Sequence, residues 1–324
     1  MTEPLLRRLA ARGEQLCVGA VPWVAPVYRL MPQVAEVIEF PFTHGRLQLR
    51  ARRRLAQQIQ GRFDTAYVCP NSAKSALLPL LAGIPRRVGY LGEARVGLLT
   101  DRLKNPPKGR QTPMVEHYGA LSGETDLVAR RPQLRLSQET LEAALTCMGL
   151  RHGSYYLFAP GAEYGPAKRW PVSHFAELAA LLDAPVVLLG SEKEFELCQA
   201  IAVPVNAKAP GQCLNLAGKT TLERAFCAIA ATKLIVSNDS GLMHVGAALG
   251  VAQVALFGSS SPVHTPPLND RASVLWLKND PHYQPALECA PCFARNCRFG
   301  HTRCLGDISV AQVLQAMTQG LKSA

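Results

Sequence analysis

The segment with the strongest chemical signal lies where an apolar stretch gives way to Asn238-Asp239-Ser240-Gly241 and then to small residues. This pattern predicts a strand, a tight turn and a helix. The free N–H groups and the positive end of the helix dipole at such a turn form an anion site that suits a diphosphate. Gly241 would let the backbone come close to a phosphate. The alternative is an ordinary helix cap by Asp239 or Ser240, with His244 one turn further on as a core residue.

A second segment, residues 160–171, is rich in glycine and proline and is predicted to connect a strand to a helix. Such composition is typical of a shaped loop. Lys168 and Arg169 would bring two positive charges to the edge of the same sheet. Cations placed over a diphosphate stabilise a leaving group that gains charge in the transition state. The alternative is a solvated basic loop.

Two weaker segments follow the same strand-to-loop pattern. Ser191 and Glu194 fit a capping box at the start of a helix, and a carboxylate at this place can also accept hydrogen bonds from ribose hydroxyls. A long polar loop, residues 257–267, follows the last major apolar stretch, and such loops often line a ligand. The sequence contains neither G-x-G-x-x-G nor G-x-x-x-x-G-K-[ST], which argues against a dehydrogenase or an NTPase.

Four of the ten cysteines, Cys289, Cys292, Cys297 and Cys304, lie close together near the end of the sequence, with His301 between the last two. Four thiolates can hold a structural Zn²⁺, so a zinc site is one hypothesis. The second pair does not have the spacing of a standard zinc knuckle, and the alternative is a set of reduced or redox-labile thiols. The other six cysteines are scattered and are expected to be small core residues.

The elements that must position these residues alternate between short apolar strands and helices. Strands are predicted over residues 15–21, 34–40, 65–69, 86–90, 155–160, 185–189, 234–237 and 254–257. Helices are predicted over residues 3–11, 47–60, 73–82, 138–148, 173–182 and 309–321. This alternation predicts an α/β fold with parallel sheets that are covered by helices on both faces.

Two similar Rossmann-like domains are expected, over residues 1–150 and 151–324. The last helix is expected either to stay in the second domain or to cross back to the first. A doubly wound domain normally opens with a strand, whereas a helix at residues 3–11 comes first here. We therefore expect the first, central strand to be missing from the N-terminal domain.

Positive charge is concentrated in the first half of the chain. Residues 1–150 carry 21 Lys and Arg against 12 Asp and Glu, a net of +9, while the whole chain has a net of +11. A basic domain predicts an anionic partner such as nucleic acid, an anionic membrane face or a phosphorylated acceptor; the alternative is a solvated basic surface.

The start of the sequence is no signal peptide and no apolar run is long enough to span a bilayer, so a cytoplasmic protein is expected.

Taken together, residues 160–171, 238–244 and 259–267 resemble glycosyltransferase family 9, the heptosyltransferases; residues 70–76 and 83–90 match it as well. The resemblance implies a GT-B fold, with two Rossmann-like domains that face a cleft and bind the acceptor and ADP-heptose respectively. It implies an inverting transfer of heptose from ADP-heptose to the heptose/Kdo inner core of lipopolysaccharide, with the second heptose as the one expected to be transferred. It also implies no catalytic metal or other cofactor, and peripheral contact with the inner face of the cytoplasmic membrane.

The resemblance also assigns roles to particular residues. It implies that Lys168 and Asp239 are catalytic, with Lys168 near the diphosphate and the departing sugar. It implies that the donor is held by Gly161, Lys168, Glu194, Asp239, Ser240, Gly241 and His244. The general base of the family is an aspartate after the first strand, which this sequence lacks, so the base is expected upstream of Met1. The chain as it stands is therefore expected to show little transfer and poor stability.

Several alternatives remain open from the sequence. The chain could be a heptosyltransferase of type I or III, a GT-B transferase that uses another nucleotide sugar, or an inactive relative. A nucleic-acid-binding module is a candidate from a different class, because the chain is basic. The sequence has no helix-turn-helix, zinc-finger or RNA-recognition signature and few aromatic residues to stack on bases, so no nucleic-acid partner is expected.

Overall fold

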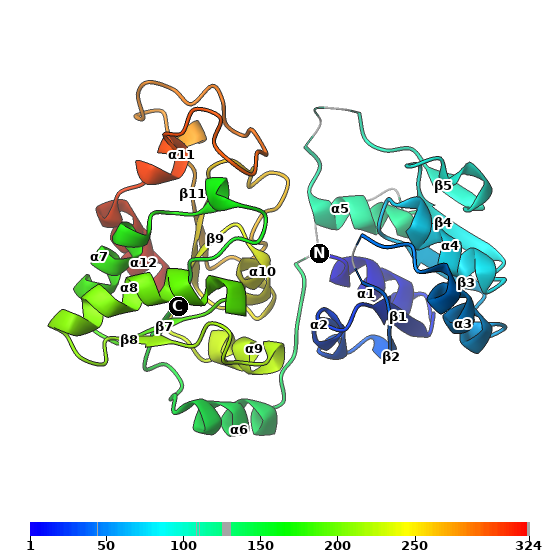
Figure 1. The fold of residues 1–324 in the computed structure, drawn as a ribbon, viewed down its shortest axis with the longest axis horizontal. Helices are drawn as coiled ribbons and strands as arrows, with labels where there is room; N and C mark the ends of the chain where they lie inside the picture. Colours follow the sequence, from blue (N-terminus) through cyan, green and yellow to red (C-terminus); the bar gives the residue numbers. More distant parts are fainter. Residues whose placement is uncertain (44, 108, 110, 125–130, 323–324) are drawn as a thin grey trace. The chain divides into compact units, whose positions relative to one another are not determined.

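The computed structural model describes residues 1–43, 45–107, 109, 111–124 and 131–322 (Figure 1). It divides into two compact units, Met1–Arg130 and Arg131–Ala324. The division lies before the expected boundary near residue 150, because helix α6 (Gln138–Met148) packs against helix α9 (Leu222–Ala230) of the second unit. The Ser137 side chain caps α6 by accepting a hydrogen bond from the Thr140 N–H.

The second unit is built on one parallel sheet with the strand order β11-β10-β9-β6-β7-β8. Its strands are β6 (Tyr156–Ala159), β7 (Val186–Leu188), β8 (Cys213–Asn215), β9 (Ile235–Asn238), β10 (Gln253–Leu256) and β11 (Ala272–Leu275). Every residue of β6, β7, β9 and β10 is buried. Such continuous burial is expected of a parallel sheet that is covered on both faces.

Helices cover this sheet (Figure 1). Helices α7 (Val172–Leu181), α8 (Phe195–Lys208) and α12 (Val310–Lys322) share one continuous hydrophobic cluster with the sheet. Helix α10 (Gly241–Ala248) packs against α9 and against β9 and β10. The last helix, α12, contacts β10, β11 and α7, so it belongs to the second unit. The remaining short helices are η3 (Pro166–Lys168), η4 (Glu192–Glu194), η5 (Leu277–Asn279) and α11 (Arg303–Gly306).

The strands of the first unit form two separate parallel sheets. One pairs β1 (Leu16–Ala20) with β2 (Val34–Glu39), and the other has the order β3-β4-β5, with β3 (Thr65–Val68), β4 (Arg86–Tyr90) and β5 (Asp101–Leu103). Among the described residues, no strand pairing joins the two sheets. The sequence predicted parallel strands here but not their division into two sheets, and the absence of a first, central strand stays a prediction.

Short helices surround the strands of the first unit. They are α1 (Glu3–Ala11), α2 (Ala25–Arg29), α3 (Leu49–Ile59), α4 (Ala73–Leu81), η1 (Arg95–Gly97), α5 (Met114–Gly119) and η2 (Ala120–Ser122). Leu5 and Leu9 of α1 pack with Val88 and Tyr90 of β4, whereas α3 and α4 form another cluster around Leu55. None of the described helices of the protein is long and apolar enough to span a bilayer.

Candidate active site

Two residues from separate segments of the second unit form an ion pair at the carboxyl edge of its sheet. Lys168 ends η3 in the loop after β6, and Asp239 directly follows β9, the strand beside β6. Lys168 Nζ donates to Asp239 Oδ2 at 2.6 Å. The Asp239 side chain is only 5% exposed and that of Lys168 18%. A strong, mostly buried charge pair therefore lies where parallel α/β sheets bind ligands.

The second carboxylate oxygen of Asp239 faces two further residues. Thr265 Oγ1 donates to Asp239 Oδ1 at 3.2 Å, and His244 Nε2 lies 4.0 Å from the same oxygen. Burial lowers the pKa of the His244 imidazole to about 4, although the Asp239 charge opposes this shift. His244 is therefore neutral at pH 7, and the charge of Asp239 is balanced by Lys168.

The backbone around Asp239 leaves an anion site open. Ser240 is the N-cap of α10, but its side chain makes no capping hydrogen bond. The Ser240 hydroxyl is buried and has no hydrogen-bond partner among the described residues, and a Cβ added at Gly241 would meet open space. The alternative interpretation, an ordinary side-chain cap of this helix, is thus not what the described residues show. The first N–H groups of α10 are available to an anionic ligand.

Asn238 fixes the loop that carries Lys168, a role that the sequence did not suggest. Its Nδ2 donates to the Pro160 carbonyl at 2.7 Å, and its Oδ1 accepts from the Trp170 N–H at 3.0 Å. Asn238 thereby ties both ends of the loop, residues 160–171, to the end of β9. An amide side chain at the end of the otherwise mainly apolar segment 234–238 was the signal that could have revealed it.

Glu194 caps a helix and remains able to accept a further hydrogen bond. Its Oε2 accepts from the Ser191 N–H at 2.8 Å and from Ser191 Oγ at 3.0 Å, so the predicted capping box is present. A Cβ added at Gly161 would lie 1.7 Å from Glu194 Oε1. Gly161 is therefore needed to make room for this carboxylate, whose Oε1 has no hydrogen-bond partner in the part of the chain that the structure describes.

The polar loop after β10 reaches the ion pair through Thr265. The Ser261 carbonyl accepts from the Thr265 N–H at 3.1 Å. It also lies 3.3 Å from Thr265 Oγ1, so it competes with Asp239 for the single proton of that hydroxyl. Ser259 and Ser260 are buried, and neither hydroxyl finds a partner within the described chain. The second predicted cation is not part of this group, because Arg169 donates to the Ala162 carbonyl of its own loop.

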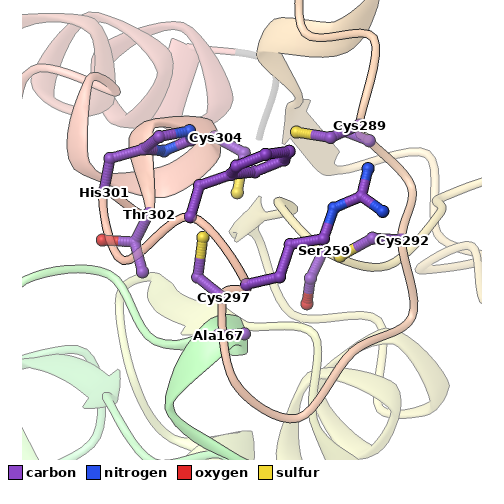
Figure 2. A pocket seen from close by; sticks show the side chains of 11 residues that line it. Ala167, Ser259, Cys289, Cys292, Cys297, His301, Thr302 and Cys304 are labelled. Atoms are coloured by element: carbon purple, nitrogen blue, oxygen red, sulfur yellow. The ribbon is translucent and has the colours of Figure 1, made fainter.

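The four clustered cysteines lie around one small cavity of about 20 Å³, together with Ala167 and Ser259 (Figure 2). All four are free thiols. Burial, and the neighbouring cysteines, raise the pKa of Cys304 to about 11. No group of three or more His, Cys, Asp or Glu side chains among the described residues is placed to hold a metal ion, so the arrangement does not support the predicted zinc site.

The fold and this site define an α/β glycosyltransferase of the GT-B type. The sequence model of glycosyltransferase family 9 (heptosyltransferase) matches residues 52–303, and the chain belongs to this family. It is 41% identical to lipopolysaccharide heptosyltransferase 2 of Escherichia coli K12 and 43% identical to that of Salmonella typhimurium LT2, each over 98% of this chain and 93% of the relative.

Solved structures agree with this assignment. The structure of the E. coli ADP-heptose lps heptosyltransferase II superposes with a TM-score of 0.85 at 38% identity, over 99% of this chain and 94% of that one. The E. coli heptosyltransferase WaaC with ADP has a TM-score of 0.68 at 18% identity, over 98% of this chain and 95% of that one, and shows the shared fold. The fold class expected from the sequence is confirmed.

Proposed function

We propose that the protein transfers a heptose from ADP-heptose to the heptose/Kdo inner core of lipopolysaccharide, and that it adds the second heptose. The observation that carries the donor part is the Lys168–Asp239 pair beside the uncapped N-terminus of α10. The acceptor part rests on relatives in E. coli and Salmonella that are named lipopolysaccharide heptosyltransferase 2 and that match nearly the whole chain.

Different residues of the second unit bind different parts of the donor. The diphosphate lies at the N–H groups that begin α10, where Gly241 leaves open space and Lys168 supplies a positive charge. Glu194 Oε1 accepts hydrogen bonds from the ribose hydroxyls while Oε2 keeps its cap. Gly161 contributes by leaving room for that carboxylate. His244 lies beside the Lys168–Asp239 pair. Because its imidazole is neutral, it adds no second positive charge there.

In the reaction, the acceptor hydroxyl oxygen bonds to the anomeric carbon as the bond from that carbon to the diphosphate oxygen breaks. ADP leaves with the electron pair of the broken bond. Lys168 and the N–H groups of α10 offset the negative charge that grows on the leaving oxygen, so we propose that no metal ion is required. Asp239 already accepts from Lys168 and Thr265. We therefore assign it to holding Lys168, and we place the base that takes the hydroxyl proton outside this group.

Calorimetry with ADP-heptose tests the donor part of the proposal. Lys168→Ala removes the cation and Asp239→Ala removes the group that holds it, so each is expected to weaken binding at least about tenfold, the equivalent of about 1.4 kcal/mol. Lys208→Ala, at the exposed end of α8, is the matched control and should bind like the unchanged protein. Equal affinity in all four proteins would contradict the assignment.

Competition assays distinguish the proposed donor from other nucleotide sugars, and transfer assays distinguish the proposed acceptor from its alternatives. We expect ADP-heptose to displace bound ADP and UDP-sugars to fail. Transfer should be seen to an inner core that already carries one heptose, and not to one that carries none. Transfer to the latter core would instead favour the enzyme that adds the first heptose.

We also propose that the first unit binds the anionic acceptor at the inner face of the cytoplasmic membrane. Arg50, Arg53 and Arg54 of α3 are exposed, and no ion pair within the described chain involves them. Each basic residue near an anionic bilayer contributes about 1 kcal/mol. Vesicles with phosphatidylglycerol should bind the protein at low salt and release it at high salt, and Arg53→Glu with Arg54→Glu should abolish binding. Equal binding to neutral vesicles would contradict this proposal.

A further inference from the structure

The cysteine-containing segment, residues 289–304, touches both loops that carry the active-site pair. It follows η5 and, among its residues, only those of α11 are helical, so few regular backbone hydrogen bonds hold it. Its four thiols instead surround a cavity of about 20 Å³ that Ala167 and Ser259 also line (Figure 2). Ala167 precedes Lys168, and Ser259 begins the loop that leads to Thr265. The cavity is thus the place where three segments, distant in sequence, meet.

On the Lys168 side, the cysteine segment makes three contacts through its own backbone and side chains. The Arg295 carbonyl accepts from the Ala167 N–H at 3.1 Å, and the Phe293 carbonyl accepts from the Tyr164 hydroxyl at 2.8 Å. The Arg295 guanidinium and Lys168 Nζ lie over the same Tyr164 ring, at 5.2 and 5.5 Å from its centre. These contacts fix the position and orientation of η3, the short helix that ends at Lys168.

On the Asp239 side, the same segment holds the start of the polar loop. The Phe293 N–H donates to the Ser259 carbonyl at 2.7 Å. A Cβ added at Gly258 would lie 2.5 Å from Leu305 Cγ and 3.0 Å from Cys304 Sγ, so the backbone of β10's end packs directly on α11. Two residues after Ser259, the Ser261 carbonyl accepts from the Thr265 N–H and so holds Thr265 beside Asp239.

We propose that residues 289–304 act as a clamp that positions Lys168 and Asp239 relative to each other for the donor. The four thiols line the small cavity of this clamp, and Phe293 and Arg295 are its two points of attachment. The clamp is a positioning device, because none of its residues is placed among the proposed donor contacts. The identity of the donor rests on the proposed function, but the mechanical coupling of the two loops does not.

Two substitutions at glycines near the clamp test this proposal. Gly258→Ala inserts a methyl group between the end of β10 and α11, whereas a Cβ at Gly306, in α11 itself, meets open space. Gly306→Ala is therefore the matched control. We expect Gly258→Ala to speed amide hydrogen exchange in residues 160–171 as well as in 258–265, without any ligand. We also expect ADP binding about tenfold weaker, with little change in circular dichroism, and we expect Gly306→Ala to behave like the unchanged protein.

A milder variant keeps the test informative if Gly258→Ala fails to fold. Tyr164→Phe removes only the hydroxyl that donates to Phe293 and leaves the ring under Lys168. It should speed exchange in residues 160–171 and weaken ADP binding a few-fold. If Gly258→Ala changes exchange only in residues 258–265, or if Tyr164→Phe changes nothing, the two loops are held independently and the clamp is refuted. Failure of the unchanged protein to bind ADP would refute the proposed function, while the exchange data would still decide on the clamp.

Discussion

The two units are built from the same alternation of parallel strands and helices, yet only the second joins its strands into one sheet. There, β6 and β9 lie side by side at the centre, and a single hydrophobic cluster extends across one face. In the first unit the strands fall into two sheets with separate, smaller clusters, and every residue of β2 keeps some exposure. A site built at the ends of neighbouring strands requires the continuous sheet, because only fixed strands can hold Lys168 and Asp239 at hydrogen-bond distance.

The largest expected difference between the units concerns their aromatic cores. Phe175 is fully buried between Phe158 and Trp170, so Phe175→Ala should lower the free energy of unfolding by about 3–5 kcal/mol. Phe42→Ala, in the smaller cluster of the first unit, should cost less because its surroundings can collapse into the space. Urea unfolding of both variants measures the two costs. A larger loss for Phe42→Ala would reverse the comparison.

Hydrogen exchange compares the two kinds of sheet without any substitution. Amides of β9 are paired on both sides and buried, whereas β1 pairs only with β2 among the described strands. Regions with few buried contacts open at lower free energy, so amides of β1 and β2 should exchange at least about a hundredfold faster than those of β9, the equivalent of about 2.7 kcal/mol. Similar rates in both sheets would show that the divided sheet is as stable as the continuous one.

Two asparagines, Asn238 at the end of β9 and Asn206 in α8, each hydrogen-bond two backbone groups through the side-chain amide. Asn238→Ala leaves the Pro160 carbonyl and the Trp170 N–H unpaired, and Asn206→Ala does the same to the two backbone groups of Cys213. Each should cost about 1–3 kcal/mol in unfolding free energy. Only Asn238→Ala should also weaken ADP binding, because only Asn238 holds the Lys168 loop. A similar loss of ADP binding in both variants would mean that general stability sets the affinity.

Acid should destabilise the second unit through His244. The pKa of this residue is lowered to about 4, below its usual value near 6.5, so the unfolded chain binds a proton more readily than the folded one. Stability therefore falls as the pH drops from about 6.5 toward 4, by at most about 1.4 kcal/mol per pH unit. His244→Gln should flatten this part of the stability curve, measured by urea unfolding. An unchanged slope would exclude His244 as its source.

The smallest expected effect concerns Thr265. Thr265→Val removes one hydrogen bond to Asp239, worth about 1 kcal/mol, and should lower kcat/KM about fivefold with little change in unfolding free energy. Thr265→Ser keeps the hydroxyl and should restore most of the activity. Steady-state kinetics with ADP-heptose measures both. Equal loss in the two variants would mean that the site needs the methyl group of Thr265 as much as its hydroxyl.

Every strand that the sequence predicted is present in the structure. The expected strands at residues 65–69, 86–90, 155–160 and 234–237 match β3, β4, β6 and β9 within one or two residues, because short segments that carry β-branched or aromatic residues between turn residues favour strands. It gave no indication of β5, β8 and β11. Asp101 and Arg102 fill most of the three-residue β5, and β8 is just as short. Such strands are fixed by their neighbours in the sheet and not by their own composition.

The sequence by itself determined most of the strands but not β5, β8 and β11, and it determined which loops carry the charged and glycine residues and to which family the chain belongs. Only the tertiary structure decided that Lys168 pairs with Asp239 and Arg169 does not, and that Asn238 and Thr265 hold that pair. Only the structure showed that the four clustered cysteines line one cavity and that no group of the described side chains is placed to bind a metal ion. The physical reason is that these contacts depend on β6 lying beside β9. Strand order is a property of the whole sheet, and no local pattern of residues encodes it.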